Sequence, residues 1–483
     1  MRTARPRLWA NLSPWVVVCA ALLFGFALDR YPTHYVDEAF FVFAAARAAA
    51  GGPFTYPVSS QEPFGNVVWA LHGPLVPHIV YFLYRFFGFS LLVSRIPDYV
   101  GAWLAVLLIV LFLRRRGYHY AGLLFAVLWC GDRAWQEVMY ARMEGVALFL
   151  LVLGFLAVER LWRQSDVLCG LWAGLALGCA CLAQPFCLFF SGIGLLWVFW
   201  LGRTRAALLF LAGCLVSVPL LIWMWGFHIH DAVTQFHWHA TRFGELRLGP
   251  SIVTLFTVLA WSRYWQIALL TFGAGAIVAA IVHLIRSGRE RSWWVEFTLS
   301  ASFALVGIKD IFHAGTKPYY IVYFSPWALL CLVVASEKAW PRMRPILFTM
   351  GLVWCTSAAW NFMRAREPVI FYHSLSHRFE RNMLLQKVPL DAAIVSTPDV
   401  FALPIEEGYK HYDVVYWFPE HEEVCPSCYL LLTREDYDKA DYVARDNLDQ
   451  RAVLYDGPAF PGAGPLAFPI MLLSPERSAG DGR

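Results

Sequence analysis

Residues 97–113 read PDYVGAWLAVLLIVLFL, and three consecutive arginines, Arg114, Arg115 and Arg116, follow them. An apolar run that ends in a basic cluster is typical of a helix that crosses a membrane with its basic end in the cytoplasm. The whole chain has a matching composition: of 483 residues, 59% are hydrophobic and 15% are charged, and the mean hydropathy is +0.51. This balance excludes a soluble enzyme, a disordered scaffold and a fibrous protein. A net charge of +4 gives no sign of a nucleic-acid partner.

Further apolar runs predict an α-helical polytopic membrane protein with about 11 transmembrane helices. The runs cover residues 15–28, 97–113, 118–130, 145–157, 168–182, 187–201, 206–225, 265–285, 293–307, 319–335 and 346–360. If the N-terminus is cytoplasmic, every inward loop carries a basic cluster, as the positive-inside rule requires, and the C-terminal region lies outside. The first run also allows a cleaved signal peptide, but no small-x-small site follows it, which favours a retained helix.

The composition divides the chain into two predicted domains and a tail. Residues 1–360 form a transmembrane domain, in which the first outside loop, residues 29–96, is the longest. Residues 361–475 are polar and predict a small α/β domain outside the membrane. Its strands are expected at residues 392–397, 412–418, 429–433, 452–455 and 470–473, and its helix at 434–443. Residues 476–483 are expected to be a disordered tail.

The first outside loop opens with two adjacent carboxylates, Asp37 and Glu38, in the sequence YVDEAFF. The alanine-rich residues 39–50 predict a helix along the membrane surface, with Asp37 near its N-terminus, where the helix dipole favours an ionised carboxylate. The alternative is a solvated cap on a surface helix. A His-Gly-Pro-Leu turn at residues 72–75 and Arg95, just before the second run, follow on the same side.

In this order and on one side, these residues resemble the GT-C glycosyltransferases. The resemblance is closest to the branch with the protein O-mannosyltransferases and the lipid A aminoarabinose transferase. Arg-Met-Glu at residues 142–144 and Lys-Pro-Tyr-Tyr-Ile at residues 317–321 fit the same branch, and the likeness covers residues 10–335. One departure is that Phe40 and Phe41 stand where the aminoarabinose transferases have Arg-Tyr, which favours a neutral hexose or pentose.

The resemblance implies a sugar carried on a polyprenyl phosphate and an inverting transfer at the outer face. It implies Asp37 as the general base, with Glu38 and Glu144 as further catalytic carboxylates. The expected ligands of the donor phosphate are His72, Arg95, Arg142, Lys317 and Tyr320. For Glu144 the alternative is an ion pair with Arg142 or Arg133, and for Arg95 it is snorkelling to the lipid headgroups.

Four histidines, His228, His230, His237 and His239, crowd the outside loop after the seventh run. On a strand, the His-x-His spacing places both rings on one face, as metal ligands would be, whereas on a helix it separates them. A divalent metal site, contacts to phosphate or acceptor, and an amphipathic interfacial helix are all open interpretations.

Two cysteines, Cys425 and Cys428, lie in the polar sequence of the predicted outside domain. In an oxidising compartment, a local disulfide is the first interpretation. A zinc site that includes His411 and His421, and a thioredoxin-like redox pair, are the alternatives.

These features together predict a multi-pass glycosyltransferase of the bacterial inner membrane, with a cytoplasmic N-terminus and an extracytoplasmic C-terminal domain. Its expected partners are a polyprenyl-phosphate sugar, membrane lipids and an acceptor protein, lipid or glycan. A transporter or lipid flippase is an alternative, for which charges in mid-span, broken helices or inverted repeats are expected. A non-catalytic relative that binds lipid-linked sugar is another.

Overall fold

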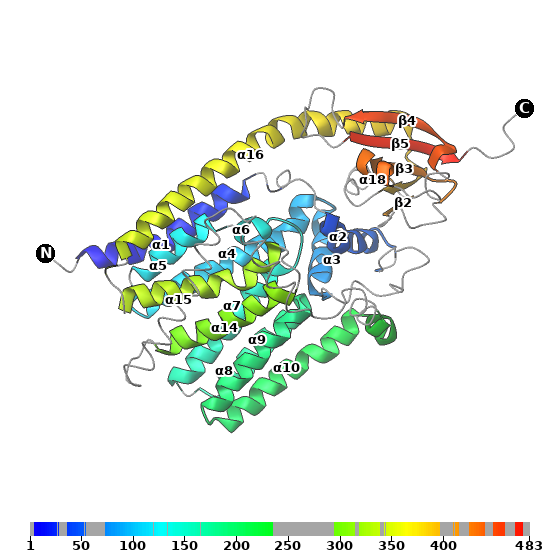
Figure 1. The fold of residues 1–483 in the computed structure, drawn as a ribbon. Helices are drawn as coiled ribbons and strands as arrows, with labels where there is room; N and C mark the ends of the chain where they lie inside the picture. Colours follow the sequence, from blue (N-terminus) through cyan, green and yellow to red (C-terminus); the bar gives the residue numbers. More distant parts are fainter. Residues whose placement is uncertain are drawn as a thin grey trace, which may run out of the picture.

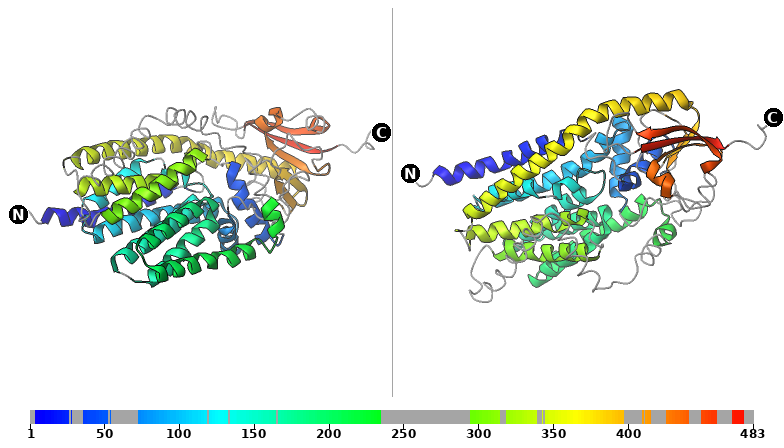
Figure 2. Two further views of the ribbon diagram at one scale, coloured as in Figure 1. Left: turned by 60° about the horizontal axis from the view of Figure 1, so that its bottom comes forward. Right: turned by 45° about the horizontal axis from the view of Figure 1, so that its top comes forward.

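A bundle of helices and a small C-terminal sheet make up the protein (Figure 1). The computed structural model describes residues 4–26, 28, 36–52, 54, 73–118, 120–132, 134–164, 166–234, 294–313, 318–338, 342, 344–396, 409, 411–414, 425–439, 448–458 and 469–476. The N-terminus and the sheet lie at opposite ends of the bundle, and α2 (Val36–Ala49) and α3 (Leu75–Phe87) lie at the same end as the sheet (Figures 1 and 2). We call the end with the sheet the distal end.

The bundle contains α1 (Ala4–Gly25), α4 (Leu91–Arg115), α5 (Ala121–Gly131), α6 (Ala134–Glu137), α7 (Glu144–Gln164), α8 (Leu168–Ala183), η2 (Pro185–Cys187), α9 (Leu188–Trp200), α10 (Thr204–Met224), α14 (Trp294–His313), η3 (Pro318–Tyr323), α15 (Ser325–Lys338) and α16 (Arg344–Lys387). Among the described residues, α4, α7 and α10 are long and apolar enough to cross a membrane, and several shorter helices are also apolar. Every predicted run overlaps one of these helices except 265–285, which lies outside the described residues. The protein is thus a multi-pass membrane protein, although the expected number of about 11 spans is not confirmed.

The first long loop is more structured than the sequence predicted. It contains α2 and α3, and α4 already begins at Leu91, so that Arg95 lies inside a helix. Residues 41–46 of α2 are buried within the protein, while the expected position of α2 at the membrane surface stays a prediction. They are buried because FVFAAA, residues 41–46, is apolar around the whole helix, and such a helix packs against the protein on every side.

Small residues let the helices approach closely. A Cβ atom on Gly174 of α8 would lie 2.0 Å from the Phe210 carbonyl oxygen of α10, and one on Gly145 of α7 would lie 1.9 Å from the Asp98 carbonyl oxygen of α4. Both pairs of helices therefore have backbones in direct contact. Membrane helices pack in this way because close van der Waals contact replaces the hydrophobic effect as the driving force.

The C-terminal sheet consists of β1 (Ala393–Ser396), β2 (His411–Val414), β3 (Tyr429–Thr433), β4 (Arg451–Pro458) and β5 (Pro469–Glu476), in the order β2-β1-β3-β5-β4. β1 is parallel to β2 and β3, whereas β5 is antiparallel to β3 and β4. α18 (Arg434–Lys439) follows β3 directly. Each predicted strand overlaps one of these strands. Of the expected tail, residues 476–483, Glu476 is the last residue of β5, and residues 477–483 lie outside the described residues.

The helix α16 joins the bundle to the sheet (Figure 2). The expected domain boundary at residues 360 and 361 lies inside this helix, which continues without a break to Lys387. Near its end, Met383 and Leu384 pack on one face of the sheet against Leu431 and Leu472. The opposite face packs against Leu448. The sheet is therefore covered on both faces.

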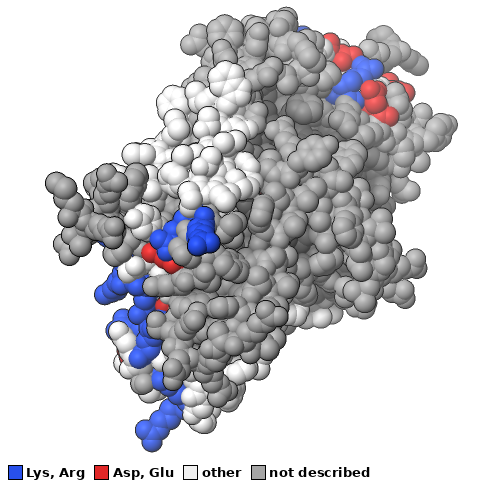
Figure 3. All heavy atoms as spheres, turned by 60° about the vertical axis from the view of Figure 1, so that its left-hand side comes forward, with Lys and Arg blue, Asp and Glu red and all other residues white. Residues whose placement is uncertain are grey.

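Basic side chains gather at the end of the bundle that carries the N-terminus (Figure 3). The exposed ones are Arg114, Arg115, Arg160, Arg205 and Arg342. Arg163 is instead paired with two buried carboxylates, those of Glu159 and Glu296. Some of the basic clusters that the sequence assigns to the cytoplasm thus also join helix ends to one another.

Candidate active site

A buried ion pair ties α2 to α4 at the distal end. Arg95 donates from Nε to Oε1 and from Nη2 to Oε2 of Glu38, both at 2.8 Å, and neither residue is exposed. Arg95 Nη1 also donates to the Leu28 carbonyl at 2.9 Å, and Glu38 Oε1 accepts from the Ala141 backbone N–H at 2.7 Å. Because both carboxylate oxygens are engaged, Glu38 acts here as an anchor. Its catalytic role and the phosphate-binding role of Arg95 stay predictions.

A second buried carboxylate, which sequence reasoning missed, lies one turn farther along α4. Asp98 Oδ1 accepts from the backbone N–H groups of Gly145 and Val146, at 2.6 and 3.0 Å, and so caps the start of α7. A carboxylate is stabilised there by the unpaired N–H groups and the helix dipole. Asp98 could have been recognised from the sequence, because it is the one acidic residue in the apolar run 97–113.

Glu144, the first residue of α7, pairs with a neighbour in the chain. Arg142 Nη2 lies 3.0 Å from Glu144 Oε1, and both residues are buried. The Arg142 guanidinium also lies over the ring of Phe41 in α2, 5.9 Å from its centroid. The ion pair that was the alternative interpretation of Glu144 is therefore present, but it is buried rather than at the surface.

These contacts hold the segment 141–146 at both ends. Glu38, from α2, accepts the N–H of Ala141, and Asp98, from α4, accepts those of Gly145 and Val146. The starts of α2 and α7 and the first turns of α4 thus meet at the distal end. η3, which follows residue 317, packs against α6 and α7.

Several expected site residues are described only in part. Asp37 is the second residue of α2, and Tyr320 lies in η3, but the side chains of both are outside the described part of the structure. His72 and Lys317 are wholly outside it. Their expected roles stay predictions.

The histidine loop is described only at its start. His228 and His230 are exposed just after α10, and His228 Nδ1 lies 4.0 Å from Asp231 Oδ2. His237 and His239 lie outside the described residues. Among the residues that the structure describes, no three His, Cys, Asp or Glu side chains are grouped so as to hold a metal ion.

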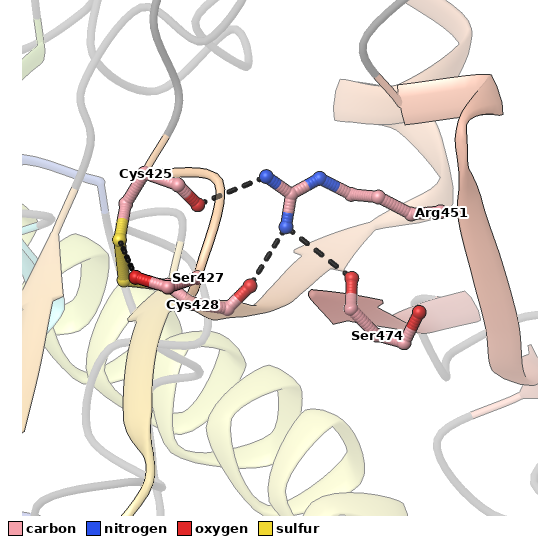
Figure 4. Close-up of a disulfide and its surroundings, with 5 residues drawn as sticks. All are labelled: Cys425, Ser427, Cys428, Arg451 and Ser474. Atoms are coloured by element: carbon pink, nitrogen blue, oxygen red, sulfur yellow. Dashed lines mark hydrogen bonds between the residues drawn. A yellow bond between two sulfur atoms is a disulfide. The ribbon is translucent and has the colours of Figure 1, made fainter. Parts of the chain in front are cut away.

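The two polar-sequence cysteines form a disulfide, Cys425–Cys428, at the start of β3 (Figure 4). Arg451 holds this short loop from β4. Its Nη2 donates to the Cys425 carbonyl at 2.9 Å, and its Nη1 donates to the carbonyls of Cys428 and Ser474, at 2.7 and 3.3 Å. The loop is thus part of the structural framework of the sheet.

No family model matches the chain, and no curated protein is similar to it in sequence. Its fold is that of the GT-C glycosyltransferases, so the fold that the resemblance implied is confirmed. The structure of ArnT from Cupriavidus metallidurans bound to undecaprenyl phosphate is similar over 95% of this chain and 97% of that chain, with a TM-score of 0.60 and 12% identity.

Two further solved structures are less similar. The S. cerevisiae protein O-mannosyltransferase Pmt1-Pmt2 complex, bound to the sugar donor, matches 48% of this chain and 35% of that chain, with 18% identity and a TM-score of 0.34. The Archaeoglobus fulgidus oligosaccharyltransferase, in complex with Zn and sulfate, matches 95% of this chain and 73% of that chain, with 12% identity and a TM-score of 0.48. Neither likeness adds to the fold assignment.

Proposed function

We propose that the protein is a membrane glycosyltransferase that moves a sugar from a polyprenyl-phosphate donor to an acceptor at the distal end. The observation that carries the proposal is the buried pair of Glu38 and Arg95. It anchors the first turn of α2, and with it the backbone of Asp37, beside the segment 141–146. The fold shared with ArnT, which was solved with undecaprenyl phosphate, supports a lipid-linked donor.

In the proposed reaction, an oxygen of the acceptor hydroxyl bonds to the anomeric carbon as the bond from that carbon to the phosphate oxygen breaks. Asp37 accepts the hydroxyl proton as general base, and the polyprenyl phosphate leaves with the bonding electrons. A single displacement of this kind inverts the anomeric centre. Because a helix N-terminus stabilises an ionised carboxylate, Asp37 is a weak base, and proton transfer comes late in the reaction.

Positive charge is needed next to the leaving phosphate. Arg95 and Arg142 are each bonded to a buried carboxylate, so their charges are already balanced. We therefore propose His72 and Lys317, together with Tyr320, as the main ligands of the donor phosphate. A divalent metal at the histidine loop remains a separate proposal, which a chelator would test by abolishing transfer.

The proposed orientation follows from the exposed arginines at the N-terminal end of the bundle. With these on the cytoplasmic side of a bacterial inner membrane, the distal end faces outward. A polyprenyl phosphate of the outer leaflet then presents its headgroup at the level of Glu38 and Glu144. Phe40 and Phe41 favour a neutral hexose or pentose as the transferred sugar.

The test is a lipid and glycan analysis of a deletion strain, complemented with wild type or with Asp37→Asn. We expect the deletion strain to lack one sugar and to accumulate its polyprenyl-phosphate donor. Asp37→Asn should behave like the deletion, whereas Asp391→Asn, at an exposed position after α16, should restore transfer. Full transfer by Asp37→Asn at equal expression would contradict the proposed mechanism.

A further inference from the structure

A buried glutamine at the distal end has no hydrogen-bond partner. Gln184 connects α8 to η2, and its side chain is completely buried. Neither its amide nitrogen nor its amide oxygen forms a hydrogen bond within the structure as described. Buried polar groups are nearly always paired, because an unpaired one has lost its bonds to water, so a side chain with two unmet atoms requires an explanation.

Gln184 lies at the same end of the bundle as two parts of the proposed site. It follows α8, which packs along α7 and runs in the opposite direction, so Gln184 and Glu144 lie at the same end of this helix pair. Gly73, next to the proposed phosphate ligand His72, lies in close contact with the backbone at the end of α8. A Cβ atom on Gly73 would lie 2.2 Å from the Leu182 carbonyl oxygen and 2.8 Å from that of Ala183. The donor-binding turn is thus in contact with the residues just before Gln184.

The two unpaired atoms of the Gln184 amide indicate which class of ligand fits there. An amide offers donors from its nitrogen and an acceptor at its oxygen, without a charge. A sugar hydroxyl both donates and accepts, so neighbouring hydroxyl groups match both amide atoms. A phosphate ester that is fully ionised only accepts, and would leave the amide oxygen unpaired. The backbone of Gln184 is extended, with φ −145° and ψ 112°, so its side chain can turn toward a ligand without unwinding a helix.

We propose that Gln184 is a sugar-binding residue, whose amide forms paired hydrogen bonds with hydroxyl groups of the donor sugar. The proposal rests on the proposed function and deepens it, because it assigns recognition of the sugar to the α8–η2 connection and leaves the phosphate to the residues near His72 and Lys317. The two unmet hydrogen bonds of the free protein are then formed only when the donor is bound.

The test compares wild type with Gln184→Leu in the purified full-length protein. The probes are the lipid-linked sugar that the deletion strain accumulates and undecaprenyl phosphate without a sugar. We expect Gln184→Leu to raise KM for the lipid-linked sugar about tenfold, equal to about 1.4 kcal/mol. Its affinity for undecaprenyl phosphate should be unchanged. Its melting temperature should equal or exceed that of wild type, because two unpaired buried atoms are removed.

The matched control is Ser191→Ala. Ser191 is also buried and belongs to α9, but its hydroxyl is paired with the carbonyls of Leu177 and Cys187, at 3.2 and 3.3 Å. This variant should leave both affinities unchanged and should not raise the melting temperature. If Gln184→Leu does not fold, Gln184→Met gives the same test with a more flexible side chain.

Three outcomes would overturn the inference. The first is an unchanged KM for the lipid-linked sugar, and the second is an equal loss of affinity for both probes, which would indicate a phosphate contact. The third is a melting temperature that falls while KM stays constant, which would indicate that Gln184 binds only a water molecule. Failure of the proposed function is distinguishable, because wild type itself would then neither bind nor use the lipid-linked sugar.

Discussion

Arg95 and Glu38 meet in a two-point ion pair that is completely buried between α4 and α2. Two parallel N–H···O bonds of 2.8 Å satisfy both carboxylate oxygens, and the third arginine nitrogen bonds to the Leu28 carbonyl. A planar guanidinium matches a carboxylate in this way, whereas a lysine does not. The pair thus fixes where α2 begins, and α2 carries Asp37 in its first turn.

Glu38→Gln should destabilise the protein strongly, because it leaves Arg95 charged and only partly paired in a buried site. A loss of about 3–5 kcal/mol in the free energy of unfolding is typical when one partner of a buried pair is removed. The measurement is thermal unfolding in detergent, together with sugar transfer, which should also fall. The control is Asp166→Asn, which removes a long, exposed pair with Arg160 and should change stability by less than about 1 kcal/mol. A wild-type melting temperature for Glu38→Gln would show that the pair is not structural.

Gly145→Ala should push α4 and α7 apart. The added Cβ atom would lie 1.9 Å from the Asp98 carbonyl oxygen, which is backbone and cannot rotate away. Overpacking of this kind costs about 1–3 kcal/mol. In contrast, Gly192→Ala in α9 meets nothing within 4 Å, so it should be neutral or stabilising by about 0.5–1 kcal/mol. The melting temperatures of the two variants should therefore shift in opposite directions, and equal shifts would argue against direct contact of the helices.

Arg451→Met should loosen the sheet without changing the bundle. It removes the three hydrogen bonds to the carbonyls of Cys425, Cys428 and Ser474, and bonds from a charged donor are worth about 1.5–3 kcal/mol each. We expect faster hydrogen exchange in β3 and β4, with unchanged exchange in α4 and α7. Arg434→Met, at an exposed pair with Asp456, should change exchange little. Unchanged protection of β3 in Arg451→Met would contradict this role.

His78 should make the packing of α3 sensitive to acid. Burial lowers the pKa of His78 below its usual 6.5, although the hydrogen bond from Nδ1 to the Pro74 carbonyl, 2.7 Å long, opposes this shift. The unfolded chain then binds the proton more readily than the folded one, so stability is full above about pH 6.5 and falls as the pH drops below it. Unfolding measured between pH 7 and pH 5 should show this loss. His78→Phe keeps a ring against Phe54 and Trp223 and should lose less stability over the same interval.

Much of the fold is readable from local sequence. A membrane requires long apolar runs, so the helices that match the predicted runs were recognisable from composition, apart from their exact ends, whereas α3 and α6 were not predicted. The strands β1, β3 and β5 were recognisable in the same way, because a short apolar run between polar segments is typical of a buried strand. Features that depend on neighbouring elements were not predicted: residues 41–46 of α2 are buried within the protein, and α16 continues through the expected domain boundary at residues 360 and 361.

The candidate site, like the fold, could be predicted from the sequence only in part. Its residue types and their position on one side of the membrane follow from sequence order. Arg95 and Glu144 each lie next to the start of an apolar run, and Asp37, Glu38 and His72 lie in the first outside loop. Which side chains bond to one another does not follow, since Glu38 and Arg95 are 57 residues apart and Asp98 is 47 residues from the N–H group it caps. Hydrophobic periodicity assigns each residue to a helix face but carries no information about the charge on the facing helix. Only the packing of α2 against α4 turns Glu38 into an anchor, and only the burial of the α8–η2 connection leaves the amide of Gln184 unpaired.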